Sequence, residues 1–260
     1  MSPRIDLSYR ARIGVLVASA VAAIVAAMLI DRFDEPVTYY RFADTRSILG
    51  VRNFMDVVSN LGFLIVGVLG LAHLRGGEVR WPFAVFFGAV VLTTFGSAYF
   101  HLEPLLGDGT PNSARMFWDR LPIAVAFMAL LAAFVADRVH ARAGLVLLPL
   151  LVAAGVAATL HWYATFDGAA GDLRFYALVQ AYPAVAIVLM CWLFPGRRSH
   201  GRYVLYMLCS YAVAKAFETY DSEVYDLLTI SGHTIKHLLA AVAAYAVLAM
   251  LRHTAPEGGN

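Results

Sequence analysis

The chain has 260 residues, of which 60% are hydrophobic and 15% are charged, and its formal net charge is +2. A soluble domain carries about 25% charged residues, so this composition excludes an ordinary soluble protein and indicates an integral membrane protein. The two cysteines, Cys191 and Cys209, lie in apolar runs and provide neither a disulfide framework nor a CxxC metal site. No basic patch is interleaved with aromatic residues, so we expect no nucleic-acid partner, and no obligate protein partner is evident.

Eight apolar runs are long enough, or nearly so, to span a bilayer, which takes about 20 helical residues. Because their connections are short, we predict one all-α, polytopic membrane helix bundle. The first run follows several arginines, as in a signal peptide, but no clean cleavage site precedes Asp31, so we expect a retained helix. In chain order the expected spans are 12–30, 55–74, 82–101, 119–136, 143–161, 174–194, 203–220 and 233–251.

The distribution of arginines predicts the orientation of these spans. With a cytoplasmic N-terminus, more arginines fall in inner than in outer segments, as the positive-inside rule requires. Both termini are then cytoplasmic, and most acidic residues fall at the outer face. The short loops and the Ala- and Arg-rich composition are prokaryote-like, which favours a bacterial inner membrane.

Two histidines, His233 and His237, begin the last apolar run at positions i and i+4, so they lie on one helical face. Such a pair could bind one metal ion, or it could consist of two interfacial histidines in the headgroup region. Ser97 and His101 repeat the i, i+4 spacing at the end of the third run, and Asp119 lies in the first turn of the fourth. Under the predicted topology all five residues lie at the same depth, toward the outer face.

Three imidazoles with an open fourth position describe a catalytic zinc site, because a structural site takes four protein ligands. Nitrogen ligands in tetrahedral geometry also favour zinc over metals that prefer oxygen. Zinc lowers the pKa of a bound water to about 7. Asp119 could accept a proton from that water, and Ser97 could orient it or donate to an oxyanion.

The ordered set Ser97-x3-His101, Asp119 and His233-x3-His237 resembles the signature of the alkaline ceramidase family. That family belongs to a superfamily of seven-helix metal-dependent hydrolases that includes the adiponectin/progestin-type receptors. The segment Asn53-Phe-Met-Asp-Val-Val-Ser-Asn-Leu61 is similar to the beginning of the family's first core helix, and the resemblance covers residues 44–250.

The resemblance implies that His101, His233 and His237 bind zinc, that Asp119 assists the water and that Ser97 supports the transition state. It implies an amidase that hydrolyses the N-acyl bond of ceramide, or of a related N-acyl lipid, to a fatty acid and a long-chain base. Two alternatives stay open, namely another zinc-dependent lipid hydrolase and a non-enzymatic receptor-like membrane protein. A transporter is disfavoured because the polar residues gather at one face.

The chain departs from the family by an extra helix in front of the seven-helix core. We therefore expect a cytoplasmic tail and extra transmembrane helix over 1–31, a ceramidase-like domain over 32–252 and a cytoplasmic tail over 253–260. Animal members carry an acidic calcium-binding segment before their first helix. Asp44, Asn53 and Asp56 are oxygen-bearing residues in the corresponding region, where they could bind Ca²⁺ or serve only as caps and loop residues.

Five more polar residues are candidates for supporting the metal-binding histidines from behind. His161 and Tyr163, near the end of the fifth run, could do so, or they could belong to an interfacial aromatic belt. Lys215 and Glu218 have the i, i+3 spacing of an ion pair, and together with Asp221 they could brace the last helix.

Overall fold

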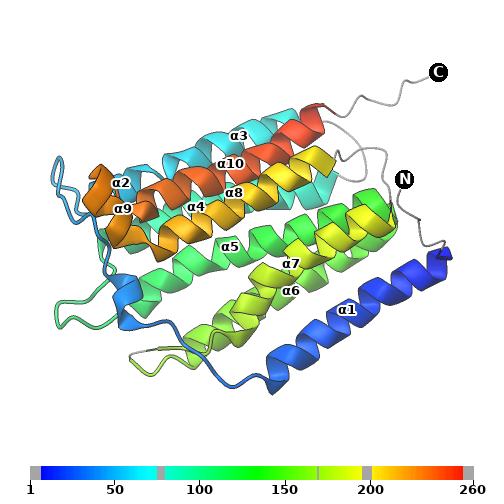
Figure 1. Ribbon diagram of the computed structural model, residues 1–260, viewed down its shortest axis with the longest axis horizontal. Helices are drawn as coiled ribbons and strands as arrows, with labels where there is room; N and C mark the ends of the chain where they lie inside the picture. The colour runs from blue at the N-terminus through cyan, green and yellow to red at the C-terminus, as the bar shows by residue number, and fades with distance from the viewer. Residues whose placement is uncertain (1–6, 75–79, 169, 195–200, 254–260) are drawn as a thin grey trace.

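The computed structural model describes residues 7–74, 80–168, 170–194 and 201–253, and this part of the chain is an all-α bundle (Figure 1). The predicted fold class is thereby confirmed. The two chain ends, residues 1–6 and 254–260, lie outside the described residues, so the predicted cytoplasmic tails fall almost wholly there. The elements are α1 (Tyr9–Leu29), η1 (Val37–Tyr40), α2 (Phe54–Val58), α3 (Leu61–His73), α4 (Arg80–Leu102), α5 (Ser113–Phe134), η2 (Val135–Val139), α6 (Ala141–Ala164), α7 (Arg174–Leu193), α8 (Gly201–Thr219), α9 (Asp221–Leu228) and α10 (Gly232–Arg252).

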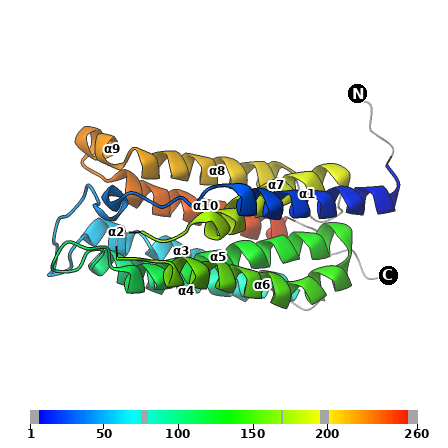
Figure 2. The same cartoon turned by 90° about the horizontal axis from the view of Figure 1, so that it is seen from below.

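Seven helical segments of the described chain are long and apolar enough to cross a membrane, counting α2 and α3 as one, and they make the chain an integral membrane protein. Seven of the eight predicted spans are among these segments, and the remaining one, 203–220, is less apolar. The run 203–220 does form α8, which lies alongside α10 (Figures 1 and 2). However, α8 contains Arg202, Lys215 and Glu218 and does not reach the apolarity of the other spans.

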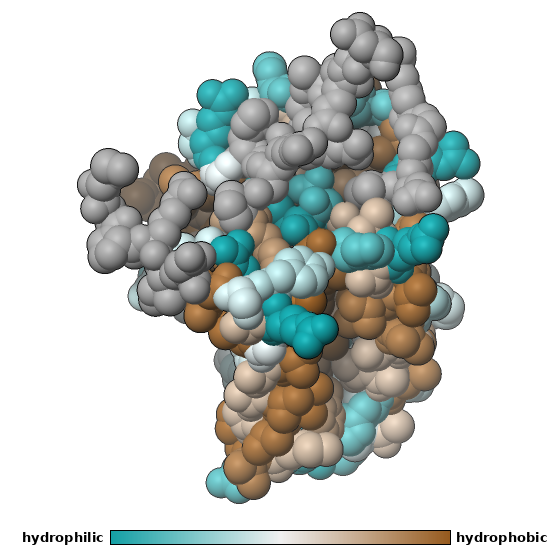
Figure 3. Space-filling view, turned by 90° about the vertical axis from the view of Figure 1, so that its right-hand side faces the viewer, coloured by the Kyte–Doolittle hydropathy of each residue, from teal (hydrophilic) through white to brown (hydrophobic). Residues whose placement is uncertain are grey.

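The positions of the helices in the bundle follow from how much of each is buried. In the most apolar window of α5, 61% of the residues are buried, whereas the figure for α1 is 6%. Thus α5 is a central helix, while α1 packs on α7 and exposes Val17, Val21 and Met28. In Figure 1, α1 lies at the bottom of the bundle. Figure 3 shows the same molecule from its right-hand end, and hydrophobic residues dominate the lower part of that view. This is the surface expected of a helix that faces lipid.

Three helices that matter for the site begin at polar side chains that cap their free backbone N–H groups. The hydroxyl of Ser8 accepts a bond from the backbone N–H of Ala11 in α1. The side chain of Asn112 accepts one from Arg115 at the start of α5, and the hydroxyl of Ser231 accepts one from Thr234 at the start of α10. These caps fix where α5 and α10 begin.

The polar residues named from sequence gather at one end of the bundle. The first turn of α1 and the last turn of α10 lie at the right in Figure 1, and α2 and α9 lie at the left. His101 is in the last turn of α4, and Asp119 and His233 are near the starts of α5 and α10, so all three lie at the end that carries α2 and α9. These three residues thus lie at the same end of the bundle.

Candidate metal centre

His101, His233 and His237 form a compact, buried triangle. Their ring centroids are 4.7 Å apart for His101 and His233, 4.9 Å for His101 and His237, and 4.8 Å for His233 and His237. One ring nitrogen from each lies within 4.8 Å of the others, so the three residues could bind a single ion. No other group of three His, Cys, Asp or Glu residues in the described ranges has this arrangement.

The start of α10 is held in place by carboxylates and by a close helix contact. Asp221 accepts a hydrogen bond from the backbone N–H of His233 at 2.8 Å. Asp56 accepts bonds from the hydroxyls of Ser231 at 2.7 Å and Thr234 at 2.6 Å. A Cβ at Gly232 would lie 2.1 Å from the carbonyl oxygen of Phe217, so only glycine allows α10 to begin this close to α8.

The ring of His237 is oriented by Ser59, a residue that the sequence reasoning did not single out. The Ser59 hydroxyl donates to the backbone carbonyl of Asp56 at 3.0 Å and lies 2.8 Å from Nδ1 of His237. Because a hydroxyl has one hydrogen, its oxygen then accepts from Nδ1–H of His237. This tautomer leaves the lone pair on Nε2 of His237 available for a metal.

His101 is fixed by its backbone and by an aromatic cover. The amide of Asn53 donates to the carbonyl oxygen of His101 at 2.7 Å. The ring of Phe42 lies 4.4 Å from that of His101 and 4.6 Å from that of His233, between centroids. Nδ1 of His101 is buried and has no hydrogen-bond partner among the described residues. A buried polar nitrogen without a partner is costly, which fits a role as a metal ligand.

These observations are compatible with a site for one metal ion. The donors are three buried nitrogens, one with an oriented tautomer and one without a protein partner. Three histidines are a known ligand set for zinc that keeps a fourth position for water or substrate. His101, His233 and His237 would therefore hold the ion.

Ser97 and Asp119 lie beside the triangle on the wall of a cavity of about 340 Å³ that also includes His237. The Ser97 hydroxyl lies near the Asp119 carboxylate. Their approach depends on Gly96, because a Cβ there would lie 2.0 Å from the carbonyl oxygen of Trp118. The rest of the wall is mostly apolar and includes Phe63, Phe86, Val90, Phe127, Leu130, Ile187, Met207 and Val247.

The predicted supporting group on α8 and α9 lies next to α10. Glu218 binds Lys215 and also lies 2.6 Å from Nζ of Lys236, whose ammonium is 3.3 Å from Nε2 of His233. The hydroxyl of Tyr39 donates to Glu218 at 3.2 Å. Asp221 also accepts a bond from the backbone N–H of His233. Lys215, Glu218 and Asp221 therefore all lie close to the first turn of α10.

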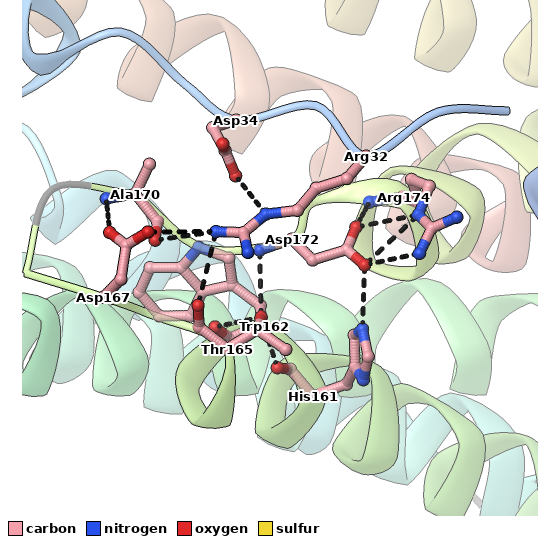
Figure 4. Close-up of polar contacts among 9 residues, drawn as sticks. All are labelled: Arg32, Asp34, His161, Trp162, Thr165, Asp167, Ala170, Asp172 and Arg174. Carbon is pink, nitrogen blue, oxygen red and sulfur yellow. Dashed lines mark hydrogen bonds and ion pairs between the residues drawn. The ribbon is translucent and has the colours of Figure 1, made fainter.

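His161 and Tyr163 lie elsewhere. Nε2 of His161 is 3.0 Å from the carboxylate of Asp172, which also forms an ion pair with Arg174 (Figure 4). The bonds from Arg174 hold the pKa of Asp172 well below its usual value. The ring of Tyr163 is exposed and packs on Phe117. The supporting role is therefore corrected for both residues: His161 belongs to the network that ties the connection after α6 to Arg32, and Tyr163 to a surface aromatic group.

The candidate calcium residues have protein partners of their own. Two nitrogens of the Arg46 guanidinium bind the carboxylate of Asp44 at 2.8 and 2.6 Å, and these bonds lower the pKa of Asp44. Asn53 bonds the backbone of His101, and Asp56 bonds the two hydroxyls of α10. Among the described residues, neither Asp44 nor Asp56 belongs to a group of three His, Cys, Asp or Glu side chains that could hold a metal ion. The geometry supports the alternative, in which they hold loops and helix starts.

No protein-family model matches this sequence, and a search of curated proteins found no match. The resemblance to alkaline ceramidases thus stays an expectation based on the site residues.

Proposed function

We propose that this protein is an intramembrane zinc-dependent amidase that hydrolyses the N-acyl bond of ceramide or a related N-acyl lipid. One observation carries the proposal. Ser97, Asp119 and His237 line one cavity, most of whose wall is apolar, and the histidine triangle lies beside it. A receptor would not require a carboxylate and a hydroxyl on the same cavity wall beside a potential metal site.

The roles of the residues follow from their chemistry. His101, His233 and His237 would hold a zinc ion, which would supply a Lewis acid and would lower the pKa of a water to about 7. Asp119 is the acceptor for the proton of the attacking water and can pass it to the leaving amine. Ser97 lines the cavity together with Asp119 and can donate its one hydroxyl hydrogen to the developing oxyanion. Ser59 keeps His237 in the tautomer described above.

The cavity suits an amphiphile. Its volume of about 340 Å³ lies within the range of ligand pockets, and its apolar wall matches an acyl chain. The amide would lie between Asp119 and the histidines, with the chain directed into the bundle. Ester hydrolysis by the same residues is the second candidate reaction. Assays on matched amide and ester lipids distinguish an amidase from an esterase.

We further propose that the site lies toward the outer face of a bacterial inner membrane, with both termini cytoplasmic. Two observations support this orientation. Arginine is in excess on the predicted inner side, and the first turn of α1 and the last turn of α10 lie at the same end of the bundle. Reporter fusions at the C-terminus and in the 103–112 connection test this orientation. A C-terminus on the outer side would contradict it.

Metal analysis paired with an amide-hydrolysis assay tests the function. The purified wild-type protein should contain one zinc per chain and release fatty acid from an N-acyl long-chain base. His237→Ala should lose both, and His161→Ala, which alters a histidine bonded to Asp172, should keep both. Zinc-loaded wild-type protein that hydrolyses no N-acyl lipid would contradict the amidase proposal, and full zinc occupancy in His237→Ala would remove that residue from the metal site.

A further inference from the structure

Two lysines on the wall of the cavity share one buried carboxylate. Lys215 and Glu218 belong to α8, and Lys236 lies between the two histidines of α10. Oε2 of Glu218 binds Nζ of Lys215, and Oε1 lies 2.6 Å from Nζ of Lys236. The exposed fraction of the Glu218 side chain is 7%, against 49% for Lys215 and 18% for Lys236. Glu218 thus holds two lysine side chains in place while both keep accessible surface.

The acceptors around the two ammonium groups are fewer than their donors. Each ammonium has three N–H donors. Among the described residues, the side-chain partners of both ammonium groups are Glu218 and, for Lys236 alone, Nε2 of His233 at 3.3 Å. Oε1 of Glu218 also accepts a bond from the hydroxyl of Tyr39 at 3.2 Å. One carboxylate therefore faces two positive charges, and both lysines keep a donor for a ligand.

A metal ion at the histidines would remove the acceptor that Lys236 has on His233. A neutral imidazole has one donor nitrogen and one acceptor nitrogen, and only the acceptor can bind a metal. If Nε2 of His233 binds the metal, its lone pair is used, and if Nδ1 binds it, Nε2 carries the hydrogen. In both cases the ammonium of Lys236 loses this acceptor. An acceptor on a ligand of the cavity would replace it.

The charge of the cavity wall favours an anionic group on that ligand. The described carboxylates of the wall are as many as its lysines and arginines, and their charges cancel when all are ionised: Glu35, Asp119, Glu218, Arg120, Lys215 and Lys236. Glu35 and Arg120 form an ion pair with each other, so this part of the wall is neutral. A divalent ion held by the histidines would add positive charge near Lys236 that the wall does not balance. A negatively charged ligand group would balance it.

We propose that Lys236 and Lys215 bind a carboxylate next to the amide, so that the site takes N-acyl α-amino acids in preference to uncharged N-acyl lipids. This inference rests on the proposed function, because it names the substrate class of the same cavity. The ammonium of Lys236 contacts the ring of His233, so its ligand must lie only a few bonds from a carbonyl held at the histidines. In an N-acyl α-amino acid one carbon separates the carboxylate from the amide nitrogen, and the two carboxylate oxygens can accept from both lysines.

The test measures binding to the full-length protein in phosphatidylcholine nanodiscs, in buffer that contains zinc. All samples carry Asp119→Asn, so that hydrolysis of the probe is slow. The probes are N-dodecanoylglycine and N-dodecanoylethanolamine, which share the acyl chain and the amide and differ in a carboxylate against a hydroxyl. We expect the glycine probe to bind about 10- to 100-fold more tightly, the value of a hydrogen bond to a charged group. Equal or weaker binding of the glycine probe would overturn the proposal.

Two variants locate the preference at the lysines. Lys236→Met should bring the ratio of the two affinities close to one, and it leaves Glu218 paired with Lys215, so the protein should fold. Lys215→Met should lower the ratio by a smaller factor, because of the two lysines only Lys236 has a described contact with a histidine. Arg115→Met is the matched control and should keep the ratio, because Arg115 has a similar exposed fraction of 21% and pairs with Glu103 but does not line the cavity. A purely structural lysine would affect both probes equally, so an unchanged ratio in folded Lys236→Met protein would overturn the proposal.

A free fatty acid is the other source of a carboxylate in this cavity, and dodecanoate is the probe for it. Its carboxylate takes the place of the amide carbonyl instead of lying beyond the amide nitrogen. Lys236→Met should therefore weaken dodecanoate less than N-dodecanoylglycine. A larger effect on dodecanoate would overturn the proposal, because Lys236 would then bind the released acid.

The binding readout separates this inference from the proposed function. A preference for the glycine probe that depends on Lys236, in a protein whose wild type hydrolyses no N-acyl lipid, would contradict the amidase and leave the carboxylate site intact. Wild-type protein that hydrolyses the glycine and ethanolamine probes with equal kcat/KM would contradict the carboxylate site and leave the amidase intact.

Discussion

Ser59→Ala should weaken zinc binding without removing a metal ligand. The Ser59 hydroxyl lies 2.8 Å from Nδ1 of His237 and fixes the tautomer that presents Nε2. Loss of such an orienting partner costs about 10- to 100-fold in metal affinity. At 25 °C this corresponds to about 1.4–2.8 kcal/mol.

The same substitution removes a second bond, which has to be measured separately. The Ser59 hydroxyl also donates to the carbonyl oxygen of Asp56 at 3.0 Å, and loss of that bond should lower the stability of the metal-free protein by about 1 kcal/mol. Zinc affinity is therefore measured by competition with a chelator, and the stability of the metal-free protein by thermal melting in the same detergent.

Two variants serve as controls. Ser59→Thr keeps the hydroxyl and should keep most of the affinity. Ser210→Ala removes a hydroxyl that bonds the carbonyl oxygen of Leu239 at 2.7 Å, between α8 and α10. It should lower stability by a similar amount and leave zinc affinity unchanged. Folded Ser59→Ala protein with wild-type affinity would refute the tautomer argument.

Three further substitutions test the remaining contacts. Asp119→Asn should keep zinc and the fold but lower the hydrolysis rate on the order of 10²–10⁴-fold, the usual contribution of a general base; undiminished turnover would refute its role. Ser97→Ala should keep zinc and lower the rate on the order of 10²–10³-fold if the hydroxyl stabilises the oxyanion, and far less if it only packs. Gly96→Ala should cost about 1–3 kcal/mol in thermal melting, because its Cβ would lie 2.0 Å from Trp118, whereas Gly88→Ala on the same helix meets no atom within 4 Å and should be tolerated.

The sequence predicted the helices well because apolar runs of this length leave few alternatives in a membrane. It missed the break in the expected span 55–74, which the structure divides into α2 and α3. The reason is local: Ser59 and Asn60 both donate side-chain bonds to the carbonyl of Asp56 and compete with the regular helical pattern. Such competition depends on side-chain geometry and is invisible to hydropathy.

The histidine triangle could be predicted because two of its members have i, i+4 spacing on one helix and the third lies at a matching helix end. The partners of the triangle could not. Ser59 lies 178 positions from His237 in sequence, and Glu35 lies 85 from Arg120. The sequence left both a calcium ligand and a loop residue open for Asp44, and only the structure shows that Arg46, two positions away, binds its carboxylate.

The missed contacts of Glu35 and Asp44 share one origin, the segment between α1 and α2. It begins beside α7, where the backbone N–H of Leu173 donates to the carbonyl of Phe33. It then reaches α8 through Tyr39, α9 through the bond from Ala43 to Asp221, and α4 through Asn53. A segment without helical period gives no sequence signal for such contacts, since each of its residues faces a different helix. The end of the bundle that carries the histidines is thus completed by residues that only the tertiary structure brings there.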